Sequence, residues 1–148
     1  MGGIRAMELL FPILAGICIT LQVVFNTRVS GKIGFWETSV IVHATGLVLA
    51  VIFLLLWGGG GFKKVSEVNP LYYLGGCIGV IIIFSVMKSV TSYGPTFSLG
   101  VILVSQLIVA TLIDTFGWFD TARVSMDFTK PLGIAVMILG IILFKLRG

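Results

Sequence analysis

The chain has 148 residues, of which 57% are hydrophobic and 11% are charged, and its mean hydropathy is +1.14. A soluble domain carries roughly 25% charged residues, so the composition excludes an ordinary soluble protein and indicates an integral membrane protein. The net charge of +4 does not indicate nucleic-acid binding, because the basic residues separate apolar runs and suit the ends of membrane spans.

Five apolar runs have about the length that crosses a bilayer as a helix. The predicted fold is therefore an all-α integral membrane protein, with a single transmembrane domain over residues 1–148. Its predicted spans cover residues 9–29, 35–57, 71–92, 97–118 and 131–146. A short basic connection, residues 28–32, is expected between the first two spans. The fifth span is short, so either flanking lysines reach the surface or the helix begins before Pro131.

Amide side chains lie inside two of the predicted spans. Gln22 and Asn26 are four residues apart and therefore share one face of the first helix, and Gln106 lies near the middle of the fourth span. Lipid cannot solvate an amide, so each must face protein, water or a ligand.

The second and third spans carry small residues at helical spacing. In the second span a stripe of small or polar residues comprises Ser39, His43, Gly46 and Ala50. The third span opens with Gly75, Gly76 and Gly79, which contain a GxxxG pair. Such stripes let helix backbones approach closely in lipid.

The candidate substrate-binding residues at midplane depth are Gln22, Asn26, His43 and Gln106. Amides offer paired donors and acceptors, which suit a neutral or zwitterionic polar solute, and a histidine carries a proton in the physiological range. The alternative for each is a structural hydrogen bond between helices, worth roughly 0.6–2 kcal/mol.

Three charged residues are candidates for a gate or for coupling: Glu37, Lys88 and Asp114. Glu37 suits the positive end of a helix dipole, or it faces a cavity. Lys88 either snorkels to the membrane surface or attracts an anionic substrate. Asp114 is either a helix-end residue or the gate partner of a basic residue.

Catalysis and metal binding are not expected. The sequence has no nucleophile triad, no phosphate-binding loop and no carboxylate pair within one span. Cys18 and Cys77, inside apolar segments, suit small hydrophobic residues rather than a disulfide or metal pair, and His43 is the single histidine. We therefore expect no enzyme, no metal site and no cofactor.

Five spans place the termini on opposite sides of the membrane, and the basic residues divide equally between those sides. The N-terminal side holds Arg5, Lys63, Lys64, Arg123 and Lys130. The other side holds Arg28, Lys32, Lys88, Lys145 and Arg147. Because loop lysines and arginines set orientation, the balance favours a chain that inserts both ways and pairs with its own inverted copy. The alternative is a weak signal overridden by the first helix or by a partner chain.

Three stretches resemble the YdcZ family of small bacterial inner-membrane proteins, within the drug/metabolite transporter superfamily. They are GICITLQVVFN in the first span, PLYYLGGCIGV opening the third, and SQLIVATLIDTFGWF closing the fourth. The resemblance implies a five-helix unit that pairs with an inverted copy or a five-helix paralogue to make a ten-helix arrangement. The related small multidrug exporters carry a glutamate in the first span that binds a cation or a proton. In this chain the polar residue inside that span is Gln22, an amide that does not titrate, which argues against proton-coupled export of lipophilic cations through this position.

The sequence thus predicts a secondary transporter, an exporter of a small solute, that works by alternating access as an antiparallel dimer. A channel-like facilitator is one alternative, and it would give flux that does not saturate. An accessory subunit is another, and it would be stable only with its partner. The predicted location is the bacterial inner membrane.

Overall fold

The computed structural model describes residues 8–146, and every regular element in that range is helical. Within it, five helices are long and apolar enough to cross a membrane: Leu10–Ile33, Phe35–Trp57, Pro70–Tyr93, Pro95–Phe116 and Thr129–Leu146. The prediction of an all-helical protein with five spans is confirmed. Arg5 and Arg147, two of the basic residues counted for orientation, lie outside the described residues.

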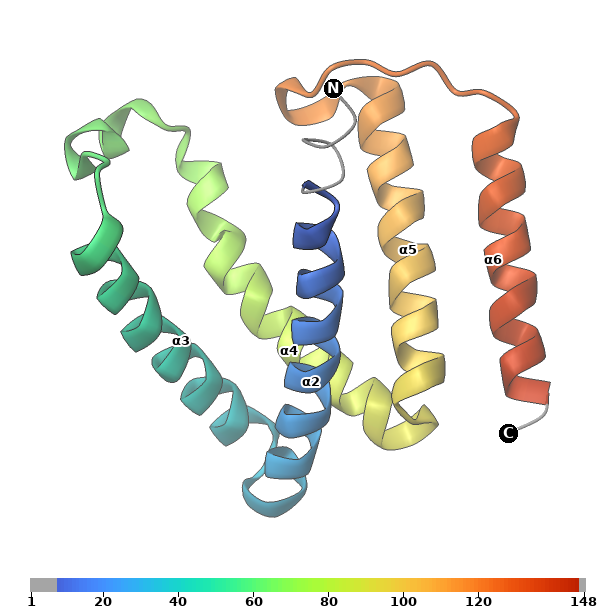
Figure 1. Ribbon diagram of the computed structural model, residues 1–148, viewed down its shortest axis with the longest axis horizontal. Coiled ribbons are helices and arrows are strands. Elements are labelled where there is room, and N and C mark those ends of the chain that lie inside the picture. The colour runs from blue at the N-terminus through green and yellow to red at the C-terminus, as the bar shows by residue number, and fades with distance from the viewer. Residues whose placement is uncertain (1–7, 147–148) are drawn as a thin grey trace. The chain divides into compact units, whose positions relative to one another are not determined.

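The chain divides into two compact units, Met1–Ser92 and Tyr93–Gly148, and each is described by itself (Figure 1). The first unit contains α2 (Leu10–Ile33), α3 (Phe35–Trp57), η1 (Phe62–Glu67), η2 (Pro70–Leu74) and α4 (Gly75–Tyr93). The second contains α5 (Pro95–Phe116), η3 (Trp118–Asp120) and α6 (Thr129–Leu146). That the two units act as a single domain remains a prediction.

One glycine joins α2 to α3. Gly34 has φ 102° and ψ 161°, a backbone conformation that side chains disfavour. Its N–H donates to Ser30 O at 3.0 Å and its carbonyl accepts from Thr38 N at 3.2 Å, so one residue ends α2 and begins α3. Residues 28–32, which we expected to form a connection, are therefore the last turns of α2.

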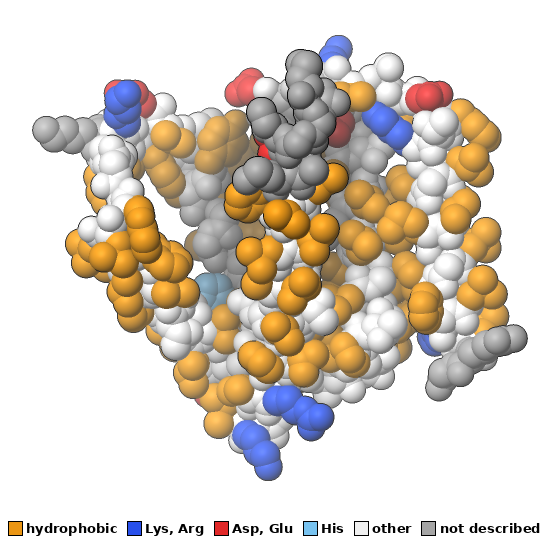
Figure 2. All heavy atoms as spheres, in the orientation of Figure 1, with side chains coloured by type: hydrophobic (Ala, Val, Ile, Leu, Met, Phe, Trp, Pro, Cys, Tyr) orange, Lys and Arg blue, Asp and Glu red, His pale blue; other side chains and the backbone are white. Residues whose placement is uncertain are grey.

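The side chains buried within the chain are mostly small or polar. Buried polar residues include Ser30, Thr38, Ser39 and Ser98, while large apolar side chains line the outside of the helices. On the face drawn in Figure 2, hydrophobic side chains cover much of the visible helices, and the Lys, Arg, Asp and Glu side chains lie mainly at their ends. In lipid, close contact between small residues replaces the hydrophobic core of a soluble protein.

In the second unit, α5 packs against α6 at a glycine. A side chain on Gly100 would place its Cβ 3.0 Å from Ile141 Cγ1, so this contact requires glycine unless Ile141 shifts. The helix α6 begins at Thr129, before Pro131, and its 18 residues give roughly 27 Å of helix. This extension supplies much of the length that the fifth span needs.

Candidate functional site

An open groove of about 450 Å³ lies between α2 and α3. Its polar lining comprises Cys18, Gln22 and Asn26 from α2 and Thr45 from α3. The remaining walls are Gly46 and large apolar side chains from both helices, and no charged side chain lines the groove. The antiparallel hairpin formed at Gly34 brings these two faces together.

Gln22 and Asn26 differ in exposure along this groove. Gln22 is exposed, whereas the Asn26 side chain is only 9% exposed. Thr45 Oγ1 donates back to Ile41 O at 2.9 Å, which occupies its donor but leaves its oxygen able to accept. The groove therefore presents two amides and one hydroxyl oxygen against apolar walls.

His43 lies on a different face of α3. Its Nδ1 is 2.8 Å from Ser39 O, one helical turn earlier. Its Nε2 lies 3.4 Å from the position of a Cβ on Gly79 of α4. The glycine of the third span therefore makes room for this ring, and His43 is not among the residues that line the groove between α2 and α3.

Gln106 is an exposed residue of α5 in the second unit. The α5 face toward α6 includes Gly100, Ile108 and Thr111. Gln106 is two residues before Ile108. At about 100° per residue, it therefore lies about 160° away from Ile108 around the helix. Its side chain is thus on the α5 face that is turned away from α6.

Glu37 and Lys88 both lie near the first residues of α3. The Glu37 carboxylate lies over Gly34, in the first turn of the helix, which agrees with a helix-start role. Lys88 Nζ is 5.7 Å from the centroid of the Phe35 ring, a cation–π distance. Both interpretations of Lys88, and the gate or coupling role of Glu37, remain predictions.

Asp114 is half-buried near the end of α5. Its backbone carbonyl accepts from Val124 N at 3.0 Å, so the following loop folds back onto the helix end. Arg123 Nε donates to Phe116 O at 3.2 Å, and the guanidinium therefore binds the end of α5. These contacts suit a helix-end residue, and the gate role of Asp114 stays a prediction.

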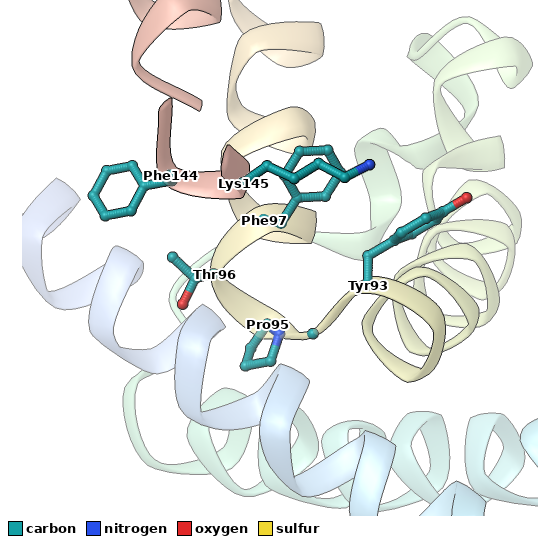
Figure 3. Close-up of a pocket in the computed structure, with 7 residues that line it drawn as sticks. Tyr93, Pro95, Thr96, Phe97, Phe144 and Lys145 are labelled. Atoms are coloured by element: carbon teal, nitrogen blue, oxygen red, sulfur yellow. The ribbon is translucent and has the colours of Figure 1, made fainter. Parts of the chain in front are cut away.

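A second open pocket of about 450 Å³ lies at the start of α5 and the end of α6 (Figure 3). Lys145 Nζ lies 4.8 Å from the Phe97 ring centroid and 5.5 Å from that of Tyr93. The two aromatic faces hold the ammonium group near the start of α5. None of the predicted site residues lines this pocket.

The structure thus brings together two of the four predicted substrate-binding residues, Gln22 and Asn26. Cys18 and Thr45 line the same groove, and we did not predict a site role for either. Cys18 is one turn before Gln22, a spacing that was visible in the sequence. Thr45 lies on another helix, and only the register between α2 and α3 places it there.

The aromatic contacts at the start of α3 were also not predicted. Trp36 stacks on Phe84 of α4 with centroids 4.5 Å apart and ring planes 11° apart. Phe35 meets the same Phe84 ring edge-on at 5.7 Å. This cluster fixes the contact between α3 and α4 beside Gly34.

A family model described as "Putative inner membrane exporter, YdcZ" matches residues 7–143. The chain belongs to the YdcZ family. The YdcZ match confirms the resemblance based on the first, third and fourth spans, and with five apolar helices it identifies a multi-pass inner-membrane protein. The family description indicates a membrane transporter rather than an enzyme. Comparisons with curated proteins and with solved structures gave no match.

Proposed function

We propose that this YdcZ-family protein exports small neutral or zwitterionic solutes by alternating access, with the groove between α2 and α3 as part of its binding site. The observation that carries the proposal is the presence of Gln22 and Asn26 in one uncharged groove. Two amides there supply both donors and acceptors without a charge that would favour an ion.

The rest of the groove fits the same class of solute. Ligand sites are mostly apolar, with a few convergent polar groups that fix orientation. Here large apolar side chains form the walls, while the amides and the Thr45 oxygen form the polar part. A solute with a hydrogen-bonding end and an apolar body satisfies both surfaces.

The groove is open at its surface, and we propose that a second, inverted copy of the chain, or a five-helix paralogue, completes it. Inverted repeats in transporters place the substrate near the bilayer midplane, between the repeats. The exposed Gln106 of the second copy then supplies a further amide to the completed site. The equal division of lysines and arginines favours a homodimer of this kind.

The proposed homodimer requires the C-terminus to lie on both sides of the membrane. A reporter fused to the C-terminus, active only in the cytoplasm, and a second, active only outside it, should both give signal in the same host. Adding two lysines near one terminus of the chain should bias its insertion toward the orientation that keeps this terminus in the cytoplasm. Signal from one reporter alone contradicts the antiparallel homodimer and leaves pairing with a paralogue.

Transport itself is tested by solute flux into proteoliposomes. Candidate solutes are those that raise the melting temperature of the purified protein, because binding to the folded state stabilises it. Saturable uptake that supports counterflow agrees with alternating access. Flux that does not saturate indicates a channel instead, and stabilisation by charged solutes alone contradicts the proposed solute class.

A further inference from the structure

The hydrogen bond from His43 identifies which of its nitrogens can exchange a proton. Nδ1 lies 2.8 Å from the Ser39 carbonyl oxygen. A carbonyl oxygen only accepts hydrogen bonds, so Nδ1 carries the hydrogen and donates it. Nε2 is therefore the nitrogen with a free lone pair, at which a proton binds and leaves.

Nε2 lies against α4 at Gly79, a residue that has no side chain. A Cβ on Gly79 of α4 would lie 3.4 Å from Nε2. Glycine has no side chain, and backbone carbonyls inside a helix are already hydrogen-bonded along the helix. A proton on Nε2 therefore creates an N–H group and a positive charge for which Gly79 supplies no partner.

A second polar atom lies on the same side of α3. Ser39, one turn before His43, is only 2% exposed, and within residues 8–146 its Oγ has no hydrogen-bond partner. The neighbouring Thr38 hydroxyl, by contrast, donates to Gly34 O at 2.7 Å. An unpaired buried hydroxyl costs roughly 1–3 kcal/mol. The position of Ser39 Oγ one turn from His43 therefore points to a polar group that binds Ser39 in part of the transport cycle.

Within residues 8–146, no carboxylate forms a hydrogen bond or ion pair with the His43 ring. The other titratable or charged side chains on α2, α3 and α4 are Cys18, Arg28, Lys32, Glu37, Cys77, Lys88 and Tyr93. Glu37 lies over Gly34 and Lys88 lies over Phe35, both at the start of α3. A proton on His43 therefore meets no compensating negative charge in the contacts of α3 with α4.

We propose that His43 Nε2 is the proton-binding site that couples proton movement to transport, an inference that rests on the proposed transport function. The proton comes from water on one side of the membrane and leaves to water on the other, and no other bond changes. When it binds, the unpartnered N–H and charge shift the population of the α3–α4 contact toward an arrangement that hydrates the ring. Ser39 Oγ is the acceptor nearest in sequence on that face.

Trp36 provides a reporter for this movement, because it stacks on Phe84 across the same pair of helices. The protein has three tryptophans, so Trp57→Phe with Trp118→Phe leaves Trp36 alone. In nanodiscs without solute, Trp36 emission should change in one step as the pH is varied. His43→Gln should abolish the step, whereas Glu67→Gln, which alters a carboxylate in η1 outside the long helices, should leave it in place.

A step that survives in folded His43→Gln overturns the proposal, as does the absence of any step in the parent protein. If His43→Gln does not fold, Gly79→Ala replaces it, because its added methyl group lies 3.4 Å from Nε2. That variant should move the midpoint of the step, and an unchanged midpoint contradicts the assignment.

Measurements of solute flux distinguish a failure of the His43 coupling role from a failure of the proposed transport function. Under a pH gradient, proteoliposomes with the parent protein should accumulate solute, while His43→Gln should still exchange solute but lose the accumulation. Equal accumulation by both proteins overturns the coupling role. If no solute is transported by either protein, the proposed function fails, while the fluorescence step still reports whether His43 binds a proton.

Discussion

Replacing Asn26 with leucine should lower saturable solute flux by about tenfold to a hundredfold. Leucine has a similar volume but leaves the polar groups of the bound solute without a partner, which costs roughly 1–3 kcal/mol for each hydrogen bond lost. Gln22→Leu should have the same direction of effect, and the double variant should bring flux close to that of empty liposomes. The measurement is initial uptake into proteoliposomes of a solute that stabilises the parent protein.

Thr20→Val is the matched control for both variants. Thr20 lies on α2 as well, but it lines a different surface with Gly16 and Ile17, and its hydroxyl donates to Gly16 O at 2.9 Å. Its flux should stay within about twofold of the parent protein, because it removes a polar group outside the groove. Unchanged flux in folded Asn26→Leu and Gln22→Leu would remove the amides from the site.

Gly34→Ala should destabilise the first unit by roughly 1–3 kcal/mol, because an alanine at φ 102° is held in a strained conformation. The added methyl group also collides with the Glu37 carboxylate. Glu37 is a long, exposed side chain that can swing aside, so backbone strain is the larger cost. The measurement is the free energy of unfolding in mixed detergent.

Alanine variants at two other glycines serve as controls for Gly34→Ala. Gly94 joins α4 to α5 with φ 79°, and a Cβ there meets no atom within 4 Å, so Gly94→Ala reports backbone strain alone. Gly31 lies within α2 in open space, and Gly31→Ala should stabilise the helix by roughly 0.5–1 kcal/mol. A Gly34→Ala protein as stable as Gly31→Ala would contradict the role of Gly34 in the turn.

The spans were predictable because bilayer thickness sets the length of an apolar helix. The connection between the first two was not, because a tight turn depends on the backbone of one residue, Gly34, rather than on a polar segment. Arg28 and Lys32 are compatible with either a loop or a helix end. The basic residues therefore do not mark the end of the helix.

The candidate site was predictable only within one helix. The four-residue spacing of Gln22 and Asn26 places them on one face, and both line one groove. Contacts between helices were not predictable, because helices that are apolar almost all round carry little information about which face packs inward. The position of His43 against Gly79 and the place of Thr45 in the groove depend on that rotation and register.

Alkylation of Cys18 tests the binding groove most directly, because this exposed thiol lines the groove together with Gln22 and Asn26. The chain has two cysteines, so Cys77→Ser leaves Cys18 as the single target for N-ethylmaleimide. A transported solute should slow the alkylation of Cys18, and Asn26→Leu should remove that protection. The same solute should leave the alkylation of Cys77 unchanged in Cys18→Ser protein. A transported solute that does not slow the alkylation of Cys18 would contradict binding in the groove between α2 and α3.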